Sequence, residues 1–261
     1  WELLMFSPKR TNNLAAVRHN LLVGAFHGFG KTTQAKYMQE YFGKTLVIDM
    51  ESGVQSLTDT ALDVVTVTSW DGKSDPDNGS FSFKGLMDEI NTAEFQKLGY
   101  KCLFIDSLTE LSDLLMIHME KEHQGNKNGF QIWGDYARVM IAAMKWLRNL
   151  DYHVTVTCLL AEETDDNGGV TYQPLVKGSK VGKHIPAIFD HVWCGNRTTS
   201  TGADGELIVR RFLITDNVRG YFGKSRDPLR SLSPIEETGN VTDLFKKMND
   251  AALANIKKQG N

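Results

Sequence analysis

Short apolar runs alternate with segments of helical periodicity along most of the chain. Apolar runs bounded by polar and glycine-rich turns predict buried β-strands. We expect strands at residues 21–23, 45–49, 64–68, 102–106, 153–160, 189–194 and 207–215. Apolar positions three and four apart predict helices over residues 32–42, 83–98, 108–123, 133–150 and 242–258. This alternation favours an α/β fold with a mainly parallel central sheet and helices on both faces.

The later strands follow one another without long helices, so we expect antiparallel strands at one edge of the sheet. We divide the chain into an N-terminal segment over 1–20, a core over 21–240 and a C-terminal helical segment over 241–261. The first segment is a candidate subunit tether through WELLMF (1–6), and the last is expected to pack on the core or on a neighbour. The polar or mixed stretches 71–80, 123–129 and 162–183 are predicted as mobile loops.

Composition narrows the class of protein. The 261 residues carry a net charge of −3, which excludes a globally basic nucleic-acid coat and leaves only local patches for DNA. No apolar run is long enough to cross a membrane. The three cysteines are widely spaced and fit buried thiols in a reducing cytoplasm. The sequence opens at Trp1, so we expect residues upstream of it.

Residues 25–33 (AFHGFGKTT) stand between a predicted strand and a predicted helix and match a phosphate-binding loop. Glycines allow such a loop to aim its amides inward, where the helix N-terminus also favours an anion. Lys31 would contact the β- and γ-phosphates of ATP, and the Thr32 hydroxyl would bind Mg²⁺. Ala25 replaces the usual first glycine, and the alternative is a glycine-rich turn that binds nothing. The predicted contact residues are Ala25, Phe26, His27, Gly28, Phe29, Gly30, Lys31, Thr32 and Thr33.

Acidic residues end two of the predicted strands. Asp49 and Glu51 follow one run, and either could orient a water or cap the next turn. Asp106 ends the run CLFID, a Walker B pattern that would hold Mg²⁺ from a strand beside that of the phosphate loop. Because the carboxyl ends of parallel strands meet at one edge of a sheet, these acids are expected near the loop.

Two basic stretches are candidate contacts to phosphate groups. In GKSR, Lys224 and Arg226 would reach a neighbouring subunit's γ-phosphate, or form an exposed hairpin end. The stretch 177–184 would be a flexible DNA-gripping loop or a solvated one. Trp133 and Tyr172 are candidate stacking residues, for which we favour core positions. The predicted DNA contacts are Lys177, Lys180, Lys183 and His184.

Taken in chain order, AFHGFGKTT, VIDMESG (47–53), LFIDSLTEL (103–111), WGDY (133–136), IFDHV (188–192) and GKSR (223–226) resemble RecA-type P-loop ATPases. More narrowly, the chain resembles phage-encoded ATPases of single-strand annealing and recombination, including AAA-type nucleotide-binding proteins. The resemblance implies that Glu51 is the catalytic carboxylate, that Asp106 holds Mg²⁺, and that Lys224 and Arg226 act across a subunit interface. No clear γ-phosphate sensor ends the fifth strand, where only Thr157 or Cys158 and then Glu162 are available.

The first functional hypothesis is a Mg²⁺-dependent ATPase that binds single-stranded DNA and promotes recombination or annealing as a ring or filament of identical subunits. A single-strand-binding protein is a further candidate partner, and the expected location is the cytoplasm, that of the host if the chain is phage-encoded. The alternatives are a nucleotide-switched adaptor or helicase loader with slow turnover, and a small-molecule phosphotransferase. The phosphotransferase would need an arginine-rich lid, and residues 120–180 contain no such cluster.

Overall fold

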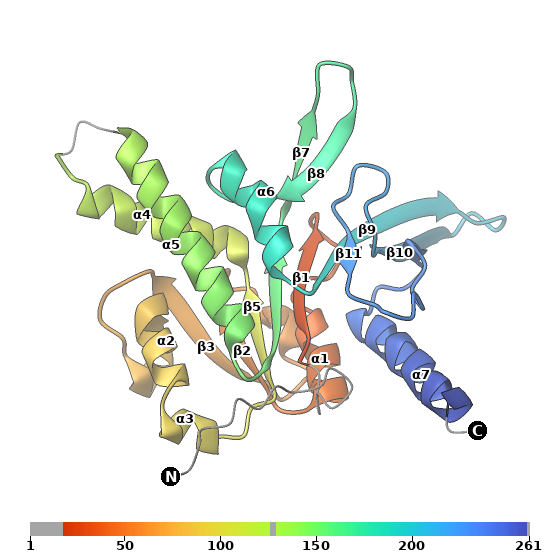
Figure 1. The fold of residues 1–261 in the computed structure, drawn as a ribbon, viewed down its shortest axis with the longest axis horizontal. Helices are drawn as coiled ribbons and strands as arrows, with labels where there is room; N and C mark the ends of the chain where they lie inside the picture. Colours follow the sequence, from red (N-terminus) through yellow and green to blue (C-terminus); the bar gives the residue numbers. More distant parts are fainter. Residues whose placement is uncertain (1–17, 126–128, 260–261) are drawn as a thin grey trace, which may run out of the picture.

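A ten-stranded mixed sheet forms the centre of the molecule (Figure 1). The computed structural model describes residues 18–125 and 129–259. The strands are β1 (Asn20–Ala25), β2 (Thr45–Asp49), β3 (Asp63–Ser69), β4 (Ser80–Ser82), β5 (Cys102–Asp106), β6 (His153–Cys158), β7 (Leu160–Thr164), β8 (Val170–Pro174), β9 (His191–Thr201), β10 (Leu207–Ile214), β11 (Lys224–Ser225) and β12 (Ile235–Glu236). The order across the sheet is β12-β10-β9-β1-β6-β5-β2-β3-β4, and β11 also pairs with β9.

All neighbours from β9 to β4 pair in parallel, whereas β10, β11 and β12 add antiparallel strands at the β9 edge. The fold prediction is therefore confirmed, including the antiparallel edge. The expected position of the Walker B strand is wrong, because β6 lies between β1 and β5. A buried apolar run reveals a strand but not its lateral neighbours, which depend on the crossover connections.

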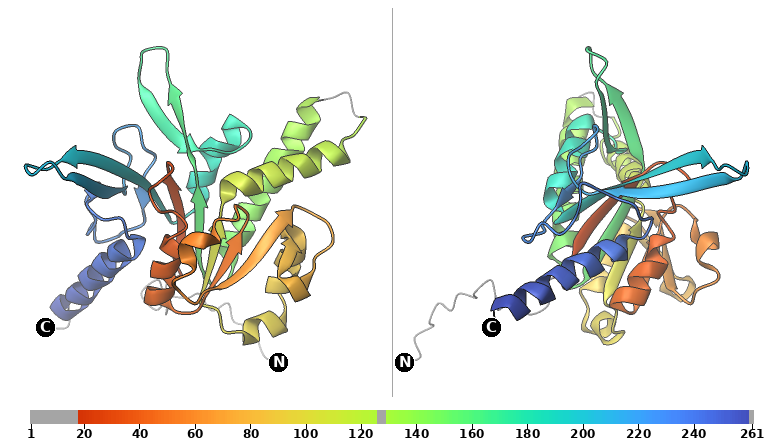
Figure 2. Two further views of the ribbon diagram at one scale, coloured as in Figure 1. Left: turned by 180° about the vertical axis from the view of Figure 1, so that it is seen from behind. Right: turned by 90° about the vertical axis from the view of Figure 1, so that its right-hand side faces the viewer.

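Helices cover both faces of the sheet (Figure 2). One face packs against α1 and α7, and the other packs against α2, α4, α5 and α6. Side chains along β1 alternate between the two cores, with Leu22 in one and both Leu21 and Val23 in the other. The helices are α1 (Gln34–Phe42), α2 (Phe83–Ile90), α3 (Ala93–Lys97), α4 (Leu108–Glu122), α5 (Gly129–Asn149), α6 (Ser179–Ile188) and α7 (Val241–Gln259), with 3₁₀ turns at Val54–Leu57 and Pro76–Asn78.

Two predicted elements are divided in the structure. The helix expected over 83–98 breaks after Ile90, where the Thr92 side chain caps the separate helix α3. The strand expected over 153–160 ends at Cys158, and β7 begins at Leu160. In both cases the apolar pattern runs across the break and therefore indicates no boundary there.

The stretch 162–183, predicted as a mobile loop, instead contains regular structure. The antiparallel hairpin of β7 and β8 projects beyond the sheet, and α6 begins at Ser179 (Figure 1). The predicted flexible DNA-gripping loop over 177–184 is therefore mostly the first turns of a helix. Val181, Ile185 and Ile188 bury one face of α6 in the core, which keeps it helical despite Gly182 and Pro186.

The C-terminal helix α7 packs on the core through Val241, Leu244 and Phe245. The candidate tether at 1–6 lies outside the described residues. The three cysteines are buried free thiols. No helix in the described part of the chain has the length and apolar character needed to span a membrane.

Candidate active site

The loop between β1 and α1 has the backbone shape of a phosphate nest. Gly28 and Gly30 have φ angles of 76° and 100°, a left-handed conformation that suits glycine. Gln34 N donates to Lys31 O and Ala35 N to Thr32 O, so the helical turn begins directly after Gly30. The loop amides and the N-terminus of α1 therefore converge, as an anion site requires.

The Gln34 side chain holds this loop in place through hydrogen bonds to backbone groups. Its side chain is 1% exposed, and its Nε2 donates to Gly30 O at 3.0 Å and to Gly239 O at 2.9 Å. Its Oε1 accepts from Val241 N at 3.0 Å. One buried amide thus satisfies three backbone groups and joins the loop to the start of α7. Nothing in the sequence near Gln34 indicates this role, because Gly239 and Val241 lie 205 and 207 positions away.

The far side of the loop rests on β9 and β10. Phe29 is buried, and a Cβ placed on Gly195 of β9 would lie 2.6 Å from its ring, so only glycine permits this approach. Arg211 of β10 donates from Nε to Phe29 O at 3.0 Å. The loop is therefore held by carbonyl hydrogen bonds and by ring packing before any ligand enters.

The predicted magnesium residues meet although their strands are not neighbours. Thr32 Oγ1 donates to Asp106 Oδ2 at 2.5 Å, and Thr157 Oγ1 donates to Asp106 Oδ1. Thr157 lies on β6, the strand between β1 and β5, so it closes the gap between them. Among the candidate sensor residues, Thr157 therefore contacts Asp106.

The oxygen groups at this point suit a hard divalent cation. Asp106 is fully buried, and burial raises the pKa of its carboxyl above the usual range, with a smaller contribution from the charge of Glu51. Hydrogen bonds from Thr157 and Thr32 and the charge of Lys31 oppose that increase in pKa. A cation bound by Thr32 and Asp106 would favour the ionised carboxylate, and Mg²⁺ prefers such oxygen ligands.

Asp49 and Glu51 have different roles. Asp49 accepts from the amides of Glu51 and Gly53 at 3.1 and 3.3 Å, so it caps the turn after β2. Glu51 is exposed and accepts a hydrogen bond from the Ser107 hydroxyl at the start of α4. A Cβ on Gly53 would lie 3.7 Å from Thr32 Oγ1, which places this turn against the loop. Of the two acids, Asp49 is buried within this cap, whereas Glu51 is exposed.

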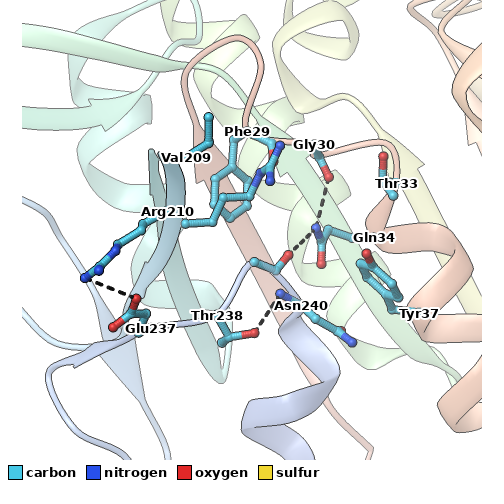
Figure 3. A pocket seen from close by; sticks show the side chains of 12 residues that line it. Phe29, Gly30, Thr33, Gln34, Tyr37, Val209, Arg210, Glu237, Thr238 and Asn240 are labelled. Atoms are coloured by element: carbon cyan, nitrogen blue, oxygen red, sulfur yellow. Dashed lines mark hydrogen bonds and ion pairs between the residues drawn. The ribbon is translucent and has the colours of Figure 1, made fainter. Parts of the chain in front are cut away.

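A cavity of about 500 Å³ opens beside the loop (Figure 3). Figure 3 shows Gln34 and Tyr37 on the right of it, Arg210 and Glu237 on the left, and Asn240 below. The volume lies within the range of cofactor sites. Its lining residues are Phe29, Gly30, Thr33, Gln34, Tyr37, Val209, Arg210, Arg211, Glu237, Thr238, Gly239 and Asn240.

The sequence profile of a family described as an AAA domain matches residues 19–227, which include the loop, both acidic strand ends and the β9–β10 hairpin. The chain belongs to this AAA domain family. The match therefore supports an ATPase-type AAA domain. Among curated protein sequences, none matches the chain significantly.

Two solved structures are distantly similar to this AAA domain chain. The flagellar accessory protein FlaH from Methanocaldococcus jannaschii is 13% identical with a TM-score of 0.35, over 80% of this chain and 84% of FlaH. The ATPase DotB from Legionella pneumophila is 11% identical with a TM-score of 0.31, over 93% of this chain and 58% of DotB. Similarities this distant do not bear on the activity of the chain.

The predicted interface cations of the AAA domain have partners in their own chain. Lys224 Nζ donates to Phe189 O at 2.6 Å and to Ala187 O at 3.3 Å, at the C-terminal end of α6. Burial lowers the pKa of Lys224, and the charge of Arg226 adds to this effect. Arg226 pairs with Asp190 at 2.8 Å. Reaching a neighbouring phosphate would require breaking these contacts, so their action across an interface stays a prediction.

The predicted DNA residues lie along α6. Lys180, Lys183 and His184 are exposed on this helix, and Lys183 pairs with Glu163 at 3.4 Å. Lys177, just before the helix, pairs with Asp113 at 3.2 Å. These pairs neutralise part of the cationic charge.

The expected core position of Trp133 is wrong, because its side chain is 49% exposed. The ring lies against the start of α6, since a Cβ on Gly178 would be 3.7 Å from it. Tyr172 does pack as expected, stacking on Tyr221 with ring centroids 4.3 Å apart. An exposed tryptophan therefore adjoins the cationic helix.

Proposed function

We propose that this AAA domain chain is a Mg²⁺-dependent ATP hydrolase. The observation that carries the proposal is the hydrogen bond from Thr32 to the buried Asp106 at the N-terminus of α1. It brings the hydroxyl of the phosphate loop to the carboxylate of the Walker B strand, the pair expected to hold Mg²⁺ in such ATPases. The adjoining cavity is large enough for the nucleoside.

In the proposed mechanism the loop amides and Lys31 bind the phosphates, and Glu51 accepts a proton from the attacking water. Ser107 holds the Glu51 carboxylate in place through its hydroxyl. Bound Mg²⁺ would supply charge neutralisation for the phosphates. Gln34 and Arg211 keep the loop in its binding shape.

Replacing Asp106 with asparagine tests the proposal. Asp106→Asn is expected to weaken Mg²⁺-dependent binding of ATP about tenfold, because an amide is a poorer partner for the cation. The melting temperature of the nucleotide-free protein should rise slightly, because burial disfavours the charged form of Asp106 and raises its pKa, whereas asparagine is neutral. Fluorescent ATP titrations with and without Mg²⁺ measure the first effect, and thermal unfolding measures the second.

The exposed Asp88 on α2 provides the control, because Asp88→Asn also removes one carboxylate but lies in no proposed contact. Wild-type protein that takes up no nucleoside triphosphate with Mg²⁺ would refute the proposed function. Equal Mg²⁺ dependence in wild type and Asp106→Asn would remove Asp106 from its role.

We further propose that the chain binds single-stranded DNA and acts in recombination or single-strand annealing, as its resemblance to the phage ATPases implies. Trp133 beside the cationic face of α6 supports this, because aromatic stacking next to lysines is a common way to bind single strands. Trp133→Ala is expected to weaken binding of an oligo-dT strand about tenfold, measured by fluorescence anisotropy.

Ile117→Ala is the matched control for the DNA experiment, since Ile117 on α4 is also 49% exposed but has no aromatic ring. Equal DNA affinity in the Trp133 and Ile117 variants, or no binding by the wild type, would contradict the DNA proposal. The ATPase proposal would stand in either case.

A nucleotide-switched adaptor or helicase loader is the second candidate. The engagement of Lys224 and Arg226 within their own chain supports it, because a site without cations from a neighbour is expected to turn over slowly. Partner binding that depends on ATP but not on DNA, with negligible hydrolysis, would favour this candidate.

A further inference from the structure

Arg197 on β9 lies against the phosphate loop. A Cβ placed on Gly28 would be 3.0 Å from Arg197 Nη1, so this guanidinium stands beside the loop backbone. The strand backbone at this point is fixed, because Gly195, two residues earlier, lies against the Phe29 ring. A strand, rather than a mobile loop, thus carries the arginine to the site.

Arg197 also stands directly opposite a second arginine. The register of the β9–β10 ladder pairs Arg197 with Arg211, so the two side chains share one face of the hairpin. Like charges in directly opposed positions destabilise a sheet. Arg211 is committed to the loop through its hydrogen bond to Phe29 O. The pair therefore concentrates positive charge at the loop, where an anion would relieve the repulsion.

In the described part of the chain, this positive charge has no acidic partner. Within residues 18–125 and 129–259, neither Arg197 nor Arg211 forms an ion pair with a carboxylate. The neighbouring Arg210, in contrast, is 3.7 Å from Glu237. Two arginines at one loop without acidic partners are typical of a phosphate contact.

We propose that Arg197 binds the terminal phosphates of a nucleotide held by the loop of the same protomer. The inference rests on the proposed ATP site and adds a cation that belongs to the same chain as that site. Arg211 acts as a positioning residue, since it holds the loop carbonyl at Phe29. On this proposal the phosphates are contacted by Lys31 from the loop and by Arg197 from the β9–β10 hairpin, without a contribution from a neighbour.

The test compares nucleotides that differ in their terminal phosphates. Arg197→Ala is expected to weaken ATP affinity about tenfold, and AMP affinity by less than about twofold, because one charge-assisted contact to the outer phosphates is lost. Arg197→Lys should restore part of the ATP affinity, since it keeps the charge but not the fork of donors. Titrations with fluorescent analogues of ATP, ADP and AMP measure these affinities.

Arg138→Ala is the charge-matched control, because Arg138 is an exposed arginine on α5 outside the site. Thermal unfolding of each variant confirms that it is folded. ATP affinity unchanged by Arg197→Ala, or lost equally for ATP and AMP, would overturn the inference while leaving the ATPase proposal intact. Wild-type protein that binds no ATP would overturn both.

Discussion

Replacing Glu51 with glutamine is expected to lower the rate of ATP hydrolysis about 10²- to 10³-fold while leaving ATP affinity within about threefold of wild type. Glutamine has nearly the same shape, and it can still meet the Ser107 hydroxyl. It cannot accept a proton from water, so only the chemical step should suffer. Single-turnover hydrolysis and nucleotide titration separate the rate from the affinity.

A nearby carboxylate serves as the control for Glu51. Glu110 lies in the first turn of α4, and the charge of Glu51 contributes to raising the pKa of its carboxyl after the larger effect of burial and that of Asp113. Glu110→Gln therefore removes a neighbouring negative charge without removing the proposed base. A Glu51→Gln protein that hydrolyses ATP at the wild-type rate would exclude Glu51 as the base, whatever the behaviour of Glu110→Gln.

We also expect the folded protein to lose unfolding free energy in mild acid. His19, His153 and His191 cluster at the end of the sheet opposite the phosphate loop, with His19 Nδ1 3.3 Å from His191 Nε2. The His19 amide donates to His153 Nδ1 at 3.3 Å. Burial is the main cause that lowers the pKa of His19 to about 3, and the pKa values of His153 and His191 to about 4.

The charged neighbours of the cluster act in both directions. His191 and His153 further lower the pKa of His19, while Asp190 raises it. Arg18 lowers the pKa of His153. For His191, Asp227 raises the pKa, whereas Arg226 and Lys224 lower it. At His19 and His191, the carboxylates that raise the pKa do not outweigh the effect of burial.

In the unfolded chain these histidines become protonated below pH about 6.5, whereas in the folded chain they stay neutral down to pH about 4. Acid therefore favours the unfolded state across this window. Each histidine is expected to remove about 1–2 kcal/mol of unfolding free energy between pH 7 and pH 5, which for three is a large part of an ordinary domain's stability. Urea unfolding at a series of pH values measures the effect.

Replacing one buried histidine should flatten this pH profile. His191→Gln is expected to reduce the acid loss of stability, although the variant is less stable at pH 7 because it disturbs packing against Trp193. His184→Gln is the control, since His184 is exposed on α6. Equal unfolding free energies at pH 7 and pH 5 in the wild type would contradict the prediction.

The parts of the site that depend on local sequence were predictable. The phosphate loop is one continuous segment, so Gly28, Gly30 and Thr32 could be assigned from their spacing alone. Asp106 could be assigned because a buried strand ends there. The lateral position of β5 could not, because the sequence does not specify that β6 pairs with both β1 and β5.

Contacts between segments far apart in the chain explain other features of the site that the sequence did not predict. Gln34 and Arg197 act through contacts with segments far away in the chain, and no local pattern identifies them. Helix α6 was obscured by its glycine and proline, although Val181, Ile185 and Ile188 have helical spacing. Trp133 has the spacing of a core residue, but it stands near the start of α5, where its side chain is half exposed.

The anchoring of the loop by Gln34 and Arg211 has a consequence for the kinetics of nucleotide capture. The carbonyls of Gly30 and Phe29 are held by side chains of the same chain, so the conformational entropy of the nest is lost during folding rather than during association. Nucleotide binding is then a single step whose observed rate rises in proportion to nucleotide concentration. Differences in affinity among nucleotides arise mainly from differences in their dissociation rates.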